Sequence, residues 1–204
     1  MSETKPRRTQ AERTAISDQR MFDAAMELIS EQGANRTTLR QICEHAGYSR
    51  GLANYRFGSK DVFLQQLLVH FNREWTRKLD SHTAGKQGLD AYDAAVDALE
   101  QFLLDHSAYM RGGYLIWYES VGGNNAVRAG LQANHNAYRQ ETRHWIEQGQ
   151  RLGQIRPEVN AEQFAVLYCS VVFGTVYQWL AAPDSIDLKQ LFSHWRLQSA
   201  ILLG

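Results

Sequence analysis

The chain has 204 residues, 44% of them hydrophobic and only 3 of them proline, which fits one large helical domain or a small one joined to a larger one. Its two cysteines, Cys43 and Cys169, form no CxxC pair, which argues against a zinc site or a disulfide framework and predicts a reducing, cytoplasmic setting. The formal net charge is 0, but residues 1–60 carry 10 Lys and Arg against 7 Asp and Glu while residues 61–204 carry 12 against 15, which is compatible with a front part that faces nucleic acid.

The chain opens with a polar arm and a first long helix. Residues 1–9 contain no apolar run after Met1, so we expect a disordered arm there. The segment from Thr9 to Glu12 fits the S/T-x-x-E capping box, which predicts a helix start, and Gly33 is the expected C-cap. Apolar residues recur between these ends at helical spacing: Met21, Phe22, Ala25, Leu28 and Ile29.

Two short helices separated by a tight turn are predicted next. The first follows Thr37 or Thr38 as its cap and ends at Gly47, which can take the positive φ that a tight interhelical turn needs. Ser49 is expected to cap the second, which runs to about Arg56. The first of these helices turns one apolar face inward: Leu39, Ile42, Cys43 and Ala46.

The rest of the chain predicts a larger helical domain. Ser59 is expected to cap a long helix from Lys60, and no later segment alternates like a strand for long. The fold class is therefore all-α, with an arm over 1–9, a three-helix helix-turn-helix domain over 10–60, and a larger helical domain over 61–204. The helices expected in the larger domain are 60–82, 89–106, 109–119, 124–151, 161–182 and 187–202.

One of these helices has the length of a membrane span. The stretch from Phe164 to Pro183 carries no charged residue. No cluster of Lys and Arg flanks it, and polar or amphipathic residues interrupt it: Tyr168, Ser170, Thr175, Tyr177 and Gln178. We expect this helix to be buried in protein rather than in lipid, and we expect no membrane partner.

The predicted second helix of the turn leaves a polar face on the outside. Arginine can bond a guanine edge bidentately and asparagine an adenine edge, so such a face suits a DNA major groove. Lys60 adds an ammonium to the free amides of a helix N-terminus, an arrangement that binds phosphate. The alternative is a structural hairpin whose polar face is only solvated. The outward set is Arg50, Gly51, Asn54 and Tyr55.

Short motifs follow one another in a fixed order between residues 12 and 64. They are Ala24-Ala25, Leu28-Ile29, Gln32-Gly33, Thr37-Thr38, Ile42, Ala46 to Gly51, and Tyr55 to Asp61. Together they resemble the signature of the TetR family of transcriptional regulators, and the remaining helices resemble that family in layout only. The resemblance implies a homodimer that binds a palindromic double-stranded operator and is released by a small-molecule effector, with repression as the expected sign. It also implies that residues 61–204 are the ligand-binding and dimerisation domain.

The resemblance also implies which residues contact DNA. Many members have Leu-Tyr where this chain has Ala53 and Asn54, so the family's tyrosine contact to phosphate is missing at 54 and Tyr55 is expected to replace it. Arg56 stands where a histidine is common and is expected to add a phosphate contact. The full expected DNA-binding set is Thr38, Arg40, Ser49, Arg50, Gly51, Asn54, Tyr55, Arg56 and Lys60.

Aromatic residues crowd the helices of the larger domain and predict an effector pocket. The alternative for each of them is a place in the core. Glu119 is the expected counter-charge in the pocket for a flat or cationic molecule. The candidate ligand-binding residues are Phe102, Trp117, Tyr118, Glu119, Tyr138 and Tyr177.

The last two helices carry features of a subunit interface. Ser170 and Gly174 are small and one turn apart, which permits close helix approach, and an apolar stripe follows in the last helix. Two such helices from each subunit would form a four-helix bundle. The alternative is packing within one chain. The stripe consists of Leu188, Leu191, Phe192 and Trp195.

Motifs of catalysis are missing from the sequence. It contains no HExxH, GxSxG, P-loop or GxGxxG pattern, and its seven histidines are scattered. We therefore expect no enzyme activity, no catalytic or metal-binding residues and no cofactor. A helical small-molecule carrier or enzyme that does not bind DNA is the alternative function.

Overall fold

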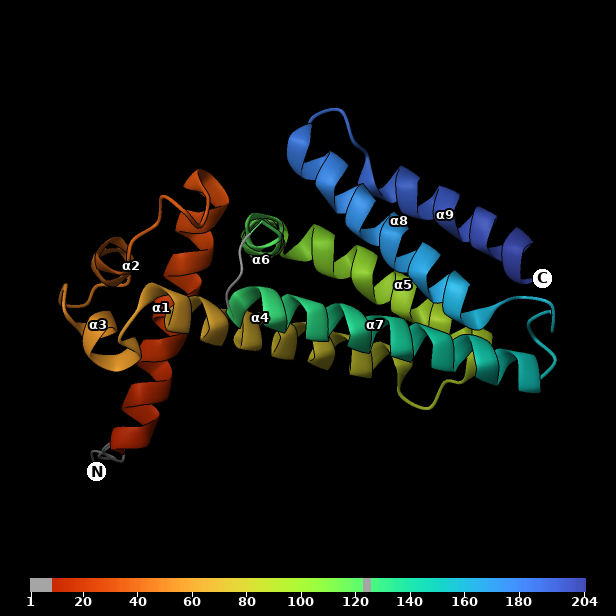
Figure 1. Cartoon of the computed structure of the whole chain (residues 1–204), viewed down its shortest axis with the longest axis horizontal. Helices are drawn as coiled ribbons and strands as arrows, with labels where there is room; N and C mark the ends of the chain where they lie inside the picture. Colours follow the sequence, from red (N-terminus) through yellow and green to blue (C-terminus); the bar gives the residue numbers. More distant parts are fainter. Residues whose placement is uncertain (1–8, 123–125) are drawn as a thin grey trace, which may run out of the picture.

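The computed structural model describes residues 9–122 and 126–204, and every regular element within these residues is an α-helix. The prediction of an all-α fold is therefore confirmed, while the predicted arm lies outside the described residues except for Thr9. In Figure 1 a small bundle of α1–α3 stands at one end of the molecule, and α4 leads from it into a larger body. The helices are α1 Gln10–Gln32, α2 Leu39–His45, α3 Leu52–Phe57, α4 Lys60–Thr83, α5 Gly88–Asp105, α6 Ser107–Ser120, α7 Ala126–Arg151, α8 Ala161–Ala181 and α9 Leu188–Leu203.

The helix starts follow the capping residues that the sequence provides. The Thr9 hydroxyl accepts a hydrogen bond from the Glu12 amide at 3.2 Å, and the Glu12 carboxylate accepts one from the Thr9 amide at 2.7 Å, so the capping box is confirmed. Thr38 caps α2 and Ser59 caps α4. The prediction for Ser49 is wrong. The third helix begins at Leu52, and its N-cap residue is Gly51, which has no side chain to accept a hydrogen bond.

The larger body consists of α4–α9, whose ends lie within two residues of the predicted ones wherever the chain is described. The helices α4, α5, α7 and α8 run side by side, and α9 covers α5 and α8. The core between them is rich in aromatic and aliphatic side chains. This arrangement places the aromatic faces of four long helices around a shared interior.

Helix α6 joins the two parts of the molecule because it lies against α1 and also packs on α4 and α7. Two glycines make this approach possible. A Cβ at Gly112 would lie 2.9 Å from the Met26 carbonyl oxygen of α1, and a Cβ at Gly113 would lie 2.5 Å from the Phe71 ring of α4. The Arg111 guanidinium also donates a hydrogen bond of 3.1 Å to the carbonyl oxygen of Ser30 in α1. A movement of α6 would therefore displace α1 directly.

Helix α9 uses part of its apolar stripe inside the chain, so the predicted assignment of the whole stripe to a dimer interface needs correction. Leu188 and Phe192 are buried, and Trp195 donates a hydrogen bond of 2.9 Å to the Tyr92 hydroxyl of α5. Leu191, in contrast, is 38% exposed. The helix has two apolar sides, one against α5 and one facing outward.

Helix α8 also keeps an outward apolar side. By length and composition it could cross a membrane, and 33% of its most apolar window is buried within the chain. The exposed residues of this side lie at helical spacing and include the small pair predicted for an interface: Leu167, Ser170, Gly174 and Tyr177.

Candidate functional site

The turn between α2 and α3 brings these two helices into contact. Gly47 has φ 77°, and the Tyr48 amide donates a hydrogen bond of 2.8 Å back to the Cys43 carbonyl oxygen. The Ala53 amide lies 3.2 Å from the Cys43 sulfur, so the small buried thiol is the point of contact between the helices. A larger side chain at 43 would push α3 away from α2. The positive φ predicted for Gly47 is therefore seen in the geometry.

The outer face of this unit is exposed and polar. Tyr55 is 90% exposed, and Asn54 and Gly51 lie on the same open surface. Arg40 and Arg50 both bind the Glu44 carboxylate, at 3.2 and 2.5 Å, which brings the two guanidinium groups together beside α3. The hydrogen bond from Arg40 lowers the pKa of Glu44.

Glu44 was not among the residues predicted from the sequence. The i, i+4 spacing of Arg40 and Glu44 is a visible signal for a helical ion pair, but the second partner, Arg50, approaches only through the turn. Glu44 therefore holds two of the predicted DNA-binding arginines, Arg40 and Arg50.

The other residues predicted to contact DNA differ in their exposure and in the hydrogen bonds that they make within the chain. Thr38 and Ser49 are exposed. Lys60 donates a hydrogen bond of 3.2 Å to the Asn35 carbonyl oxygen, at the edge of the same surface. Arg56 instead packs against α1, where it binds the Asp18 carboxylate and the Ser17 hydroxyl. A phosphate contact by Arg56 would require this internal pair to break.

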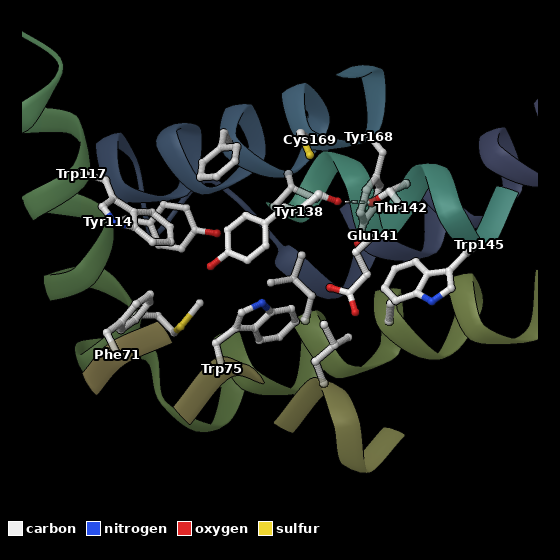
Figure 2. A pocket seen from close by; sticks show the side chains of 16 residues that line it. Phe71, Trp75, Tyr114, Trp117, Tyr138, Glu141, Thr142, Trp145, Tyr168 and Cys169 are labelled. Atoms are coloured by element: carbon white, nitrogen blue, oxygen red, sulfur yellow. Dashed lines mark hydrogen bonds between the residues drawn. The ribbon is translucent and has the colours of Figure 1, made fainter. Parts of the chain in front are cut away.

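A cavity of about 60 Å³ lies in the larger domain between α4, α5, α6, α7 and α8. Figure 2 shows Phe71 and Trp117 toward one end, and Glu141 and Trp145 toward the other. Its lining is almost entirely aromatic or aliphatic. Four residues of α7 reach it at the spacing of one helical face: Tyr138, Glu141, Thr142 and Trp145.

Two of the six predicted ligand-binding residues, Trp117 and Tyr138, line this cavity. Phe102 is buried outside the lining, with its ring 5.7 Å from that of Trp75. Tyr118 donates a hydrogen bond of 2.6 Å to the Phe173 carbonyl oxygen, and Tyr177 is exposed beside it.

Glu119, the predicted counter-charge, lies elsewhere. Its carboxylate accepts hydrogen bonds from the amides of Ala34 at 3.1 Å and Asn35 at 2.8 Å, in the loop between α1 and α2. The assignment of Glu119 to the pocket is therefore corrected. It fastens the end of α6 to the helix-turn-helix.

The residues missed by the sequence-based prediction include the one acid in the lining, Glu141. Spacing on a long helix could have indicated it, because Glu141 lies one turn from both Tyr138 and Trp145. Burial raises its pKa, and Asp80 adds to this shift. The indole nitrogen of Trp117 is buried without a hydrogen-bond acceptor among the described residues. The cavity thus contains one carboxylate in a mostly apolar wall.

Comparison with known proteins finds similarity to one family of regulators. The family model of the bacterial regulatory proteins of the tetR family matches residues 22–67, which include both helices of the helix-turn-helix. The transcriptional regulator UidR of Escherichia coli is 23% identical over 172 residues, covering 84% of this chain and 83% of UidR. The chain is therefore similar to TetR-family regulators, both in its helix-turn-helix and over most of its length.

Further similarity to TetR-family proteins extends over nearly the whole chain. The regulator TtgR of Pseudomonas putida is 26% identical over 195 residues, covering 93% of this chain and 91% of TtgR. The structure of SmeT, a repressor from Stenotrophomonas maltophilia, in complex with triclosan has the same fold with a TM-score of 0.75 at 18% identity, covering 91% of this chain and 90% of that one. These similarities support a DNA-binding transcriptional regulator and not an enzyme, and they do not favour a carrier without DNA binding.

Proposed function

We propose that this TetR-family chain is a cytoplasmic repressor that binds a palindromic operator as a homodimer and leaves it when a small molecule occupies the aromatic cavity. The observation that carries the proposal is the combination in one chain of an exposed helix-turn-helix face and an aromatic cavity, connected by α4 and α6. TtgR and UidR are regulators of the same family, and SmeT has been seen with a small molecule bound.

In this proposal α3 enters the major groove. Arg50 and Asn54 would read base edges, because their side chains match the donor and acceptor patterns of guanine and adenine. Tyr55 and Lys60 would contact the phosphate backbone, which sets the register and makes binding sensitive to salt. Arg40 and Arg50, which bind the Glu44 carboxylate in this structure, would release it and bind the DNA instead.

The dimer would form through the outward sides of α8 and α9. The exposed residues of α8 lie at spacings of three and four, which is the pattern of helices packing at a small angle. Apart from the backbone of its own helix, no atom of the described residues lies within 4 Å of the position of a Cβ at Gly174, so a partner helix could approach closely there. The proposed interface residues are Leu167, Ser170, Gly174 and Tyr177 of α8 and Leu191 and Leu202 of α9.

The switch would act through the helices that both line the cavity and contact the head. Phe71 and Trp75 lie on α4, which begins at Lys60, and Trp117 lies on α6, which ends beside Glu119. The cavity is only about 60 Å³, so a drug-sized molecule must displace these side chains. A ligand that binds the widened state more tightly shifts the spacing of the two heads, and a coupling of about 1–3 kcal/mol suffices for release.

The experiment that tests the proposal is the selection of bound sequences from random duplex DNA, followed by affinity measurements with paired variants. Arg50→Ala is expected to cost about 1–3 kcal/mol and to relax one base position, while Lys60→Ala weakens binding to all sequences alike. The exposed Arg151→Ala and Lys86→Ala variants are the matched controls. Selection of no common sequence, or equal affinity for Arg50→Ala and its control, would show that this face does not read DNA.

A further inference from the structure

The cavity contains one carboxylate and no positive charge to pair with it. Its lining has no Lys or Arg among the described residues, and Glu141 is the one Asp or Glu in it. Within the described part of the chain, Glu141 makes neither a hydrogen bond nor an ion pair, although Arg143 and Glu147 of the same helix pair with each other on the surface. An unpaired, half-buried carboxylate is costly, which makes its retention in an aromatic wall informative.

We propose that the effector is an amphipathic organic cation, an aromatic or aliphatic amine or ammonium, whose charged head binds the Glu141 carboxylate and whose apolar tail fills the aromatic end of the cavity. This assignment rests on the proposed role of the cavity as the effector site. The counter-charge is then Glu141 and not Glu119, because the Glu119 carboxylate accepts hydrogen bonds from amides of the α1–α2 loop and lies outside the cavity lining.

The surroundings of Glu141 suit a cation in two ways. In Figure 2 its carboxylate points into the cavity between the indoles of Trp75 and Trp145, with the Tyr138 ring close by. Aromatic faces attract an ammonium through the ring quadrupole, and Glu141 adds a full negative charge in a poorly solvated site. Both the aromatic faces and the Glu141 carboxylate would thus stabilise a bound cation.

The same surroundings disfavour an anion. A fatty acid or another carboxylate would meet Glu141 without a Lys or Arg in the described lining to neutralise it. Asp80 of α4 also acts on Glu141 and contributes further negative potential. A carboxylate ligand would therefore have to enter together with a proton, whereas an ammonium removes the unfavourable burial of Glu141.

The rest of the cavity selects an apolar tail. Phe71, Tyr114 and Trp117 form its inner end, away from Glu141 in Figure 2. Their rings already contact one another edge to face, with centroids 5.3 Å apart for Phe71 and Trp117 and 4.9 Å for Tyr114 and Trp117. A tail that carries a ring can insert among them and part α4 from α6.

The test compares three ligands of one shape and different charge: phenylbutylamine, phenylbutanol and phenylbutyrate. Their binding to the full-length protein without DNA is measured by calorimetry and by quenching of tryptophan fluorescence. The amine is expected to bind about tenfold more tightly than the alcohol, and the acid most weakly. In Glu141→Gln, which keeps the shape of the side chain, the amine should lose this advantage while the affinity for the alcohol stays unchanged.

The control variant is Glu147→Gln, which removes a charge from the same helix outside the cavity and should leave all three affinities as they are. Equal binding of the three ligands, tightest binding of the acid, no binding of any of them, or an unchanged preference for the amine in Glu141→Gln would each overturn the assignment. Because the measurement needs no DNA, a failure of operator binding or release counts against the proposed function and not against the ligand class.

Discussion

Removal of the Glu119 carboxylate should loosen the joint between α6 and the helix-turn-helix. In Glu119→Ala the amides of Ala34 and Asn35 lose their acceptor, and hydrogen bonds to a charged group contribute more than neutral ones. The loop is partly exposed, so water replaces part of the loss, and we expect the free energy of unfolding to fall by about 1–2 kcal/mol. For a chain of this size that lowers the melting temperature by roughly 2–4 °C per kcal/mol.

Calorimetry measures the stability change, and amide hydrogen exchange reports on the joint itself. The Ala34 and Asn35 amides should exchange faster in Glu119→Ala, while amides in the interior of α8 keep their protection. The exposed Glu158→Ala variant is the control for loss of a negative charge. The reasoning is refuted if Glu119→Ala melts like its control and the two loop amides exchange at the wild-type rate.

Three further predictions concern assembly, packing and pH. Gly174→Glu introduces a charge where the chain leaves open space, so it should give a folded monomer by light scattering, and a dimer of normal mass would exclude this part of α8 from the interface. In the monomeric Gly174→Glu background, Phe192→Ala should cost about 3–5 kcal/mol in chemical denaturation because the ring is buried. Leu191→Ala, on the outward side of the same helix, should cost little in that background, and equal costs would contradict the two-sided description of α9. Burial raises the pKa of Glu141. The affinity for phenylbutylamine should therefore fall as pH decreases through that raised pKa, while the affinity for phenylbutanol stays constant. Parallel pH profiles for the two ligands would contradict an ionised Glu141 in the complex.

Local rules explain why most helix boundaries could be predicted from the sequence. The caps at Thr9, Thr38 and Ser59 depend on residues three positions away, and the structure has all three. Ser49 failed because its carbonyl group, rather than its side chain, accepts the amide of Leu52 in a turn that precedes α3. The choice between these two arrangements depends on how α3 packs against Cys43, which no local pattern encodes.

The candidate sites were less predictable because they depend on contacts between distant segments. Glu119 binds amides that lie 84 and 85 residues earlier in the chain, so its distance from the cavity could not be foreseen. The aromatic content of the larger domain indicated a cavity, but Phe102 and Trp117 look alike in the sequence and only packing separates lining from core. The stripe on α9 was likewise visible, but not the division of its residues between α5 and the outward side.

The central claim is that two copies of this helix-turn-helix, held in one dimer, read one operator. The most direct test titrates the protein with the selected duplex and with a matched duplex in which one half-site is scrambled, between about 50 and about 200 mM salt. We expect the intact duplex to bind much more tightly, because both heads engage half-sites about 34–36 Å apart, and both affinities to fall steeply with salt. Equal affinities for the two duplexes, or binding that salt does not weaken, would contradict the account.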